Sequence, residues 1–160
     1  SLVIGVDLND YRLGLARRMG AGVTLNPKRD DWPAEVMKLT GGLGVDVVLE
    51  MSGNAGALRS GLKVCRNAGR VALLGIPSGP VELDLAGDVI FKGLRLDGIT
   101  GRRIYDTWFK SSALLRDVVD VSPIVTHRFA LEDYEKGFDL MKKGECGKII
   151  LYPGGTPAGL

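Results

Sequence analysis

The chain has 160 residues, of which 45% are hydrophobic and 25% are charged, so it can form one hydrophobic core and we expect one domain or part of a larger one. Its 21 basic and 19 acidic side chains are interspersed without a basic stripe, which argues against a nucleic-acid partner. No apolar run approaches the roughly 20 residues of a membrane-spanning helix, and the N-terminus does not resemble a signal peptide, so we expect a cytoplasmic protein with no membrane partner.

Short runs rich in Val, Ile and Leu alternate along the chain with longer stretches of helical periodicity. Such runs are typical of strands that are buried on both faces. Because parallel neighbouring strands need a long crossover, which a helix supplies, the alternation predicts an α/β fold with a doubly wound parallel sheet. The five expected strands span residues 2–6, 23–25, 45–49, 70–74 and 94–99.

The expected helices between these strands each have a polar residue at the position of an N-terminal cap. The first helix spans residues 11–19, with Asn9 or Asp10 as its cap and Gly20 at its end. The second runs from its cap Asp31 to about Gly41 and has Pro33 in its first turn. The third runs from its cap Asn54 to Arg66.

The first expected strand leads into an acidic residue, Asp7. In a nucleotide-binding sheet, an acid at the end of the second strand accepts hydrogen bonds from the adenosine ribose hydroxyls and repels a 2′-phosphate, so Asp7 favours NAD over NADP. Arg12 follows on the next helix, from which a guanidinium can reach the adenosine or its phosphates. A plain helix cap at Asp7 and a solvated side chain at Arg12 explain the same pattern equally well.

The glycine-rich turn that binds the dinucleotide pyrophosphate belongs about 20 residues before the ribose acid, yet only six residues precede Asp7. Residues 41–44, GGLG, do not replace this turn, because they follow a helix and lead into a strand. We therefore expect the chain to begin at the second strand of such a sheet. The absent first strand is central in the order 3-2-1-4-5-6, so an isolated monomer should be marginally stable. We expect either a fragment of a longer protein, or second and fourth strands that close up or pair with another copy.

Small residues follow three further expected strands, at the rim where ligands of such sheets bind. Each of these turns alone is explained equally well as a plain connection, but three successive strand ends of this kind favour a nucleotide crevice. The candidate ligand-lining residues are Ser52 and Gly53; the backbone at Leu74, Gly75 and Ile76, before a rigid turn with Pro77 and Gly79; and Ile99 and Thr100, before Gly101.

Five motifs along the chain are GVDLNDYRLGLARRMGA, VDVVLEMSGN, AGRVALLGIP, GITGR followed by TW, and SPIVTHRF. Together they resemble the L-threonine 3-dehydrogenase family of zinc-containing medium-chain alcohol dehydrogenases. The resemblance covers residues 1 to about 152 and is most specific in the last two motifs. Polyol and butanediol dehydrogenases share the strand-turn motifs, and a non-catalytic module that binds a nucleotide or only another subunit remains an alternative.

The resemblance implies an incomplete Rossmann-type sheet that forms the NAD-binding portion of an enzyme oxidising L-threonine to 2-amino-3-ketobutyrate. Asp7 and Arg12 would bind the adenosine half of NAD, and the backbone at Leu74–Ile76 and Ile99–Thr100 would border the nicotinamide half. The family's zinc ligands have no counterpart in the chain, so the chain alone should be inactive. The family also implies a homotetramer, joined partly edge to edge through the strand in LRLDGI.

By the same resemblance, the chain divides into three segments. Residues 1–102 form the NAD-binding domain without its first strand and glycine turn, residues 103–152 pack on a catalytic domain, and residues 153–160 form a flexible tail.

The remaining candidates for chemistry receive structural interpretations, and we expect no catalytic or metal-binding residue. His127, the only histidine, lacks partners at ligand spacing. Cys65 is expected in the core and Cys146 in a turn, and two such distant cysteines suit a reducing compartment. Trp108 and Phe109 are expected on a helix packed in the core or at a subunit interface.

Overall fold

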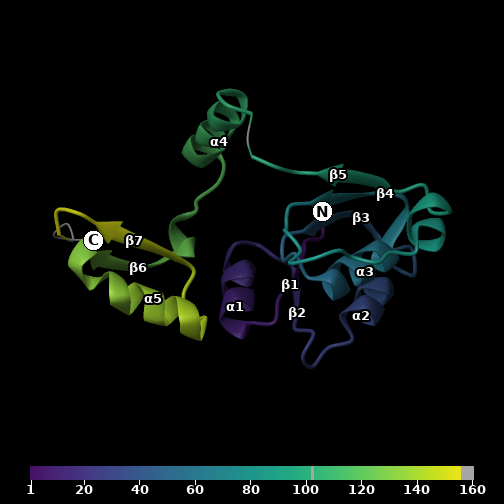
Figure 1. Ribbon diagram of the computed structural model, residues 1–160, viewed down its shortest axis with the longest axis horizontal. Helices are drawn as coiled ribbons and strands as arrows, with labels where there is room; N and C mark the ends of the chain where they lie inside the picture. Colours follow the sequence, from purple (N-terminus) through teal and green to yellow (C-terminus); the bar gives the residue numbers. More distant parts are fainter. Residues whose placement is uncertain (102, 156–160) are drawn as a thin grey trace. The chain divides into compact units, whose positions relative to one another are not determined.

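The computed structural model describes residues 1–101 and 103–155 (Figure 1). Two compact units form, the first from residues 1–30 with the C-terminal part that starts at Arg103, and the second from the residues that start at Asp31. The expected division into three segments stays a prediction, and residues 156–160 of the expected tail lie outside the described residues. None of the described helices has both the length and the apolar character needed to span a bilayer.

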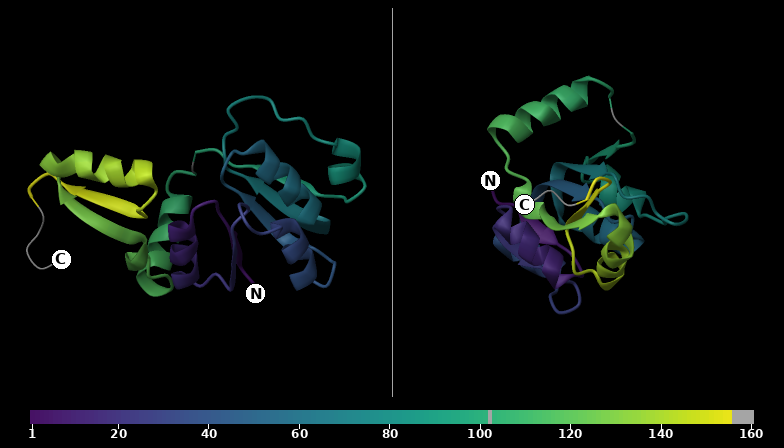
Figure 2. Two further views of the ribbon diagram at one scale, coloured as in Figure 1. Left: turned by 90° about the horizontal axis from the view of Figure 1, so that it is seen from below. Right: turned by 90° about the vertical axis from the view of Figure 1, so that its left-hand side faces the viewer.

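The second unit is built around a parallel sheet in the order β3-β4-β5. Its registers pair Val48 with Val71 and Val71 with Leu96, and Figures 1 and 2 show the three strands running in the same direction. The elements of this unit are α2 (Trp32–Leu39), β3 (Val45–Glu50), α3 (Ala55–Val64), β4 (Cys65–Leu73), the short π-helix η1 (Ala86–Ile90) and β5 (Arg95–Gly98).

The first unit contains two parallel strand pairs, β1-β2 and β6-β7. Its elements are β1 (Ile4–Val6), α1 (Asp10–Arg18), β2 (Val23–Leu25), α4 (Asp106–Asp117), the 3-10 turns η2 (Ser122–Ile124) and η3 (Leu131–Asp133), β6 (Val125–Ala130), α5 (Tyr134–Lys143) and β7 (Lys148–Tyr152).

The predicted α/β class with parallel strands is confirmed, because every described ladder is parallel. The five expected strands correspond to β1 to β5, and residues 41–44 connect α2 to β3 as expected. The ladders β1-β2 and β3-β4-β5 are separate, and pairing of β1 or β3 with a further strand or another copy stays a prediction. β5 ends its ladder, so it occupies the edge position expected for the strand in LRLDGI.

The helix caps follow the local sequence, with one ambiguity resolved. Asn9 caps α1, because its Oδ1 accepts hydrogen bonds from the backbone N–H groups of Tyr11 at 2.9 Å and Arg12 at 3.2 Å. Asp10 is the first helical residue instead. The caps Asp31 and Asn54 are confirmed for α2 and α3.

Most boundaries lie within two residues of their predictions, and the largest difference is at the start of β4. The third helix ends at Val64 rather than Arg66, and β4 begins at Cys65, five residues before the expected start of its strand. The reason is that Cys65 already pairs with Val45 across the ladder, before the register shifts and Arg70 pairs with Val47.

The core of the second unit lies between α3 and its sheet. Leu62 and Val71 are fully buried there, together with Leu58 and Cys65. Burial of such side chains contributes roughly 1.5–3 kcal/mol each, so this cluster accounts for much of the unit's stability.

The helix α4 lacks the packing expected of it. No residue of α4 is buried, and the side chains of Trp108 and Phe109 are 62% and 77% exposed. The prediction that this helix packs in the core is therefore wrong, because none of its side chains is buried against another part of the described chain. The alternative of a subunit interface stays a prediction.

The C-terminal end of α3 is held by a lysine from outside the helix. Lys92 Nζ donates hydrogen bonds to the carbonyl oxygens of Leu62 at 2.6 Å and Lys63 at 2.9 Å. These carbonyls lack partners within the helix, and the cation also complements the negative end of the helix dipole.

Replacing this lysine is expected to destabilise the second unit. Lys92→Met keeps the aliphatic stem but removes the ammonium group, so we expect the free energy of unfolding to fall by about 1–2 kcal/mol. Urea denaturation followed by circular dichroism measures this loss. Lys143→Met, which removes an exposed lysine from the last turn of α5, is the control and should cost much less. Equal losses in the two variants would contradict the capping role.

Candidate functional site

Asp7 lies directly after β1, where the chain leaves its ladder. Its backbone N–H still donates to the carbonyl of Leu25 at 3.3 Å, which extends the β1-β2 pairing by one residue. Asp7 Oδ1 accepts a hydrogen bond from the N–H of Asn9 at 2.8 Å, and this contact fixes the carboxylate. The structure thus places the carboxylate at the carboxyl end of its strand, as the sequence predicts.

The second carboxylate oxygen of Asp7 faces Arg12 across a loose ion pair. Asp7 Oδ2 is 4.0 Å from Arg12 Nη1, and the side chains are 36% and 57% exposed. An exposed pair at this distance contributes little to stability. A carboxylate with one oxygen fixed and the other exposed can accept hydrogen bonds from a vicinal diol, so the residues present fit a ribose.

A buried asparagine, which the sequence analysis missed, ties the turn after β1 to the turn after β2. Asn26 is 2% exposed, and its Nδ2 donates to Asp10 Oδ1 at 3.0 Å and to the carbonyl of Leu8 at 3.3 Å. Its backbone N–H donates to Asp30 Oδ2 at 2.6 Å. The only signal in the sequence is a polar residue directly after a short apolar strand, which is also typical of an ordinary turn.

This network lowers the pKa of the Asp10 carboxyl. The hydrogen bond from Asn26 has the largest effect on that pKa, and the guanidinium of Arg29, 2.7 Å from Asp10 Oδ1, has the next largest. A depressed pKa in the folded chain means that this carboxylate stabilises the fold above its unfolded-state pKa of about 3.9. That stability is lost as the pH falls through the lower folded-state pKa.

Removing the Arg29 guanidinium tests whether it lowers the pKa of Asp10. Arg29→Met is expected to raise the pKa of Asp10 and to move acid unfolding to higher pH, because one of the two main interactions with the ionised form is gone. Carbon-13 NMR titration of the Asp10 carboxyl measures the pKa. Lys28→Met removes a more weakly acting charge and should raise it less; a larger rise in this control than in Arg29→Met would contradict the assignment.

In the second unit, the turns after β3 and β4 are joined by Glu50, the last residue of β3. Glu50 is 7% exposed, and its Oε1 accepts hydrogen bonds from Ser52 Oγ, from the N–H of Ser52 at 2.9 Å and from the N–H of Gly53 at 3.1 Å. Its backbone carbonyl accepts from the N–H groups of Leu74 at 2.9 Å and Gly75 at 3.0 Å. Ser52, Gly53, Leu74 and Gly75 are among the predicted ligand-lining residues, whereas nothing in the sequence distinguishes Glu50.

The two turns touch through their backbones. A Cβ atom on Gly75 would lie 2.1 Å from the backbone nitrogen of Gly53, and one on Gly53 would lie 2.4 Å from the carbonyl oxygen of Ile76. Gly53 also has φ of +68°, which favours glycine. The structure therefore brings together the predicted residues of these two strand ends, and only glycine fits at either contact.

Apolar side chains are exposed at the carboxyl ends of the three strands of the second unit. Met51 follows β3, Leu74 and Ile76 follow β4, and Ile99 follows β5. All four are exposed, and Ile76 reaches 91%. Thr100 is also exposed. These residues offer apolar side chains for contact with a flat ring and backbone polar groups for hydrogen bonds to an amide, so they fit a nicotinamide. We call residues 50–53, 74–76 and 99–100 the strand-end rim.

The described residues provide no ligand set for zinc. Among residues 1–101 and 103–155, no three His, Cys, Asp or Glu side chains come together in a group that can hold a metal ion. His127 Nδ1 is 2.9 Å from Thr126 Oγ1, and its ring stacks on that of Phe129 with centroids 6.0 Å apart.

Both cysteines are free and buried. Burial raises the pKa of the Cys65 thiol, which lies in the core as expected. Cys146 lies in the connection between α5 and β7. Neither thiol is exposed to act as a nucleophile.

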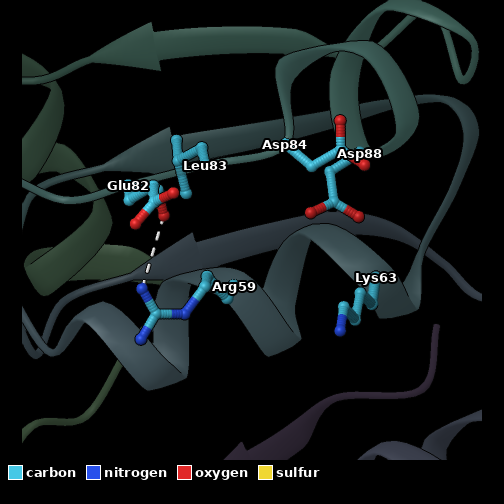
Figure 3. A pocket seen from close by; sticks show the side chains of 6 residues that line it. All are labelled: Arg59, Lys63, Glu82, Leu83, Asp84 and Asp88. Atoms are coloured by element: carbon cyan, nitrogen blue, oxygen red, sulfur yellow. Dashed lines mark hydrogen bonds between the residues drawn. The ribbon is translucent and has the colours of Figure 1, made fainter.

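A hollow away from the strand-end rim lies between α3 and residues 82–88 (Figure 3). Arg59 Nη1 donates to the carbonyl of Glu82 at 3.3 Å across it, and Lys63 stands one turn further along α3. Asp84 Oδ1 accepts from the N–H of Gly87 and so shapes its own loop. These contacts hold residues 82–88 against α3 and explain the hollow as a structural feature.

Comparisons with known proteins point to one class of enzyme. A family model described as zinc-binding dehydrogenase matches residues 2–117. L-threonine 3-dehydrogenase of Bacillus velezensis is 51% identical over 155 residues, which cover 96% of this chain and 44% of that protein. The enzyme of the same name from Symbiobacterium thermophilum is 50% identical over 155 residues, with 95% and 44% covered.

A similar solved structure is 2R,3R-butanediol dehydrogenase from Bacillus subtilis. It superposes with a TM-score of 0.84 at 28% sequence identity, over 94% of this chain and 43% of that one. The chain thus spans less than half the length of the relatives it matches.

Proposed function

The chain belongs to the zinc-binding dehydrogenase family, and we propose that it is the NAD-binding portion of an L-threonine 3-dehydrogenase, which oxidises L-threonine to 2-amino-3-ketobutyrate. The observation that carries the NAD assignment is the half-exposed Asp7 carboxylate at the end of β1. The 51% identity to a threonine dehydrogenase supports the choice of substrate.

Each half of NAD is assigned to its own set of residues. Asp7 accepts hydrogen bonds from the adenosine ribose, and Arg12 neutralises part of the pyrophosphate charge. The strand-end rim binds the nicotinamide half through the backbone of Leu74, Gly75 and Ile76 and through Ile99 and Thr100. The exposed apolar side chains of this rim exclude water from the bound ring, and NAD when bound accepts the hydride that leaves the alcohol carbon.

Zinc has no place among the described residues, so we assign no metal ligand and no metal-dependent step to them. The chain alone is therefore expected not to oxidise L-threonine. We further propose that the enzyme is a homotetramer in which the edge strand β5 takes part in assembly.

Calorimetric titration of the enzyme that contains this chain with NAD and NADP tests the proposal. We expect NAD to bind and NADP to bind at least about tenfold more weakly, since the carboxylate of Asp7 repels a 2′-phosphate. Binding of neither dinucleotide would favour the non-catalytic module, and equal affinities would contradict the role of Asp7.

A butanediol dehydrogenase is the second candidate, favoured by the TM-score of 0.84 to the enzyme from Bacillus subtilis. Steady-state rates of the enzyme that contains this chain, measured on L-threonine, 2,3-butanediol and sorbitol, separate the substrates. A higher kcat/KM on 2,3-butanediol or sorbitol than on L-threonine would overturn the threonine assignment.

A further inference from the structure

We propose that Glu50 is a positioning residue for the nicotinamide half of the dinucleotide. Its carboxylate holds the turns after β3 and β4 in one arrangement and does not itself touch the ligand. This inference rests on the proposed function, because it takes the strand-end rim as the nicotinamide side of the site.

The burial of Glu50 requires a reason. A carboxylate that is removed from water destabilises a fold unless several donors satisfy it. Here the donors come from one turn, since Ser52 supplies its N–H and its hydroxyl and Gly53 supplies its N–H. The Gly53 nitrogen is 3.1 Å from both oxygens, Oε1 and Oε2, so this one N–H group is shared between them.

The same residue also anchors the neighbouring turn through its backbone. The carbonyl oxygen of Glu50 accepts from the N–H groups of both Leu74 and Gly75, one step beyond the last ladder pair, Glu50 with Leu73. Glu50 therefore makes hydrogen bonds to the turns after both strands, with its side chain in one and its main chain in the other.

Close packing makes this arrangement sensitive to small changes. A Cβ atom on Gly75 would lie 2.5 Å from Glu50 Oε2, so the carboxylate lies directly against the backbone of Gly75. In Glu50→Gln, an NH2 group replaces one carboxylate oxygen, and this group cannot accept from the Gly53 N–H or lie against the Gly75 backbone as an oxygen does. The negative charge that strengthens the hydrogen bonds from Ser52 and Gly53 to the other oxygen is also lost. The turn that packs against Gly75 and Ile76 then has no fixed position, and the rim shifts with it.

The consequence is selective for one half of the ligand. Asp7, assigned to the adenosine ribose, is held by Asn9 and Arg12, and neither of these residues belongs to the Glu50 network. Loss of the Glu50 carboxylate should therefore weaken ligands that contain nicotinamide and leave ADP-ribose, which lacks it, unaffected. A residue with a merely structural role would weaken both ligands together.

Calorimetric titration of the enzyme that contains this chain with NADH and with ADP-ribose tests the inference. Glu50→Gln is expected to lower the affinity for NADH about tenfold and to change that for ADP-ribose less than about twofold. Glu82→Gln is the matched control, because it removes a carboxylate of the same unit that lies outside the rim, and neither affinity should change. Ser52→Ala removes one of the three donors to the carboxylate, together with the acceptor of the Asn54 N–H group at 3.0 Å, and should weaken NADH binding about threefold. It therefore tests the inference even where Glu50→Gln fails to fold.

The outcomes separate this inference from the function on which it rests. Equal loss of both ligands in Glu50→Gln and Ser52→Ala, or unchanged NADH affinity in either folded variant, would overturn the positioning role while NAD binding by the parent chain stands. A parent chain that binds neither NADH nor ADP-ribose would overturn the proposed function and this inference with it.

Discussion

Gly75→Ala is expected to cost the second unit about 3 kcal/mol of its free energy of unfolding, a larger loss than that expected for Lys92→Met. The added methyl group would lie 2.1 Å from the backbone nitrogen of Gly53 and 2.5 Å from Glu50 Oε2. Both neighbours are themselves held, one by main-chain packing and the other by hydrogen bonds, so neither can move away without loss. Urea denaturation followed by circular dichroism measures the change.

The same loop supplies the control for this experiment. Gly79 lies four residues further along, and a Cβ atom added there would have no neighbour within 4 Å. Gly79→Ala should therefore change the free energy of unfolding by less than about 1 kcal/mol. We expect a small increase, because alanine restricts the unfolded chain more than glycine does. Similar losses at Gly75 and Gly79 would show that the close approach of the two turns is not the source of the effect.

The layers of the fold were predictable because they depend on local signals. Buried parallel strands need uninterrupted apolar runs, and helices need caps, and both are visible one segment at a time. Asn9 and Asp10 were equivalent at that level, since either side chain can cap a helix. The structure separates them because Asn26 and Arg29 engage Asp10 from the turn after β2, a contact between segments that are 16 and 19 residues apart in the sequence.

The strand-end rim was predictable in part for the same reason. Glycine and serine after apolar runs indicate turns at strand ends, and parallel strands bring these ends to one edge. The role of Glu50 was not predictable, because an acid at the end of a strand is usually exposed, and its burial depends on three donors folding over it. The prediction that Trp108 lies in the core failed because apolar periodicity predicts burial without specifying what covers the side chain. The alternative of a subunit interface stays a prediction.

The assignment of Asp7 and the strand-end rim to different halves of NAD leads to a second large effect, this one on cofactor choice. Asp7→Asn keeps the size of the side chain and one carbonyl acceptor but removes the charge. We expect the affinity for NAD to fall about tenfold, because a charged acceptor of the ribose hydroxyls becomes neutral, and the affinity for NADP to stay level or rise. The ratio of the two dissociation constants, measured by calorimetric titration, is the readout.

This ratio separates a ribose contact from a general loss of structure. Asp7 also accepts a hydrogen bond from the N–H of Asn9, the residue that caps α1, so a damaged helix would weaken both dinucleotides by the same factor. Asp139→Asn, which neutralises an exposed carboxylate on α5, is the control and should leave both affinities unchanged. Parallel losses of NAD and NADP in Asp7→Asn would contradict the ribose assignment, because only direct contact with the 2′-position makes the side-chain charge act in opposite directions on the two ligands.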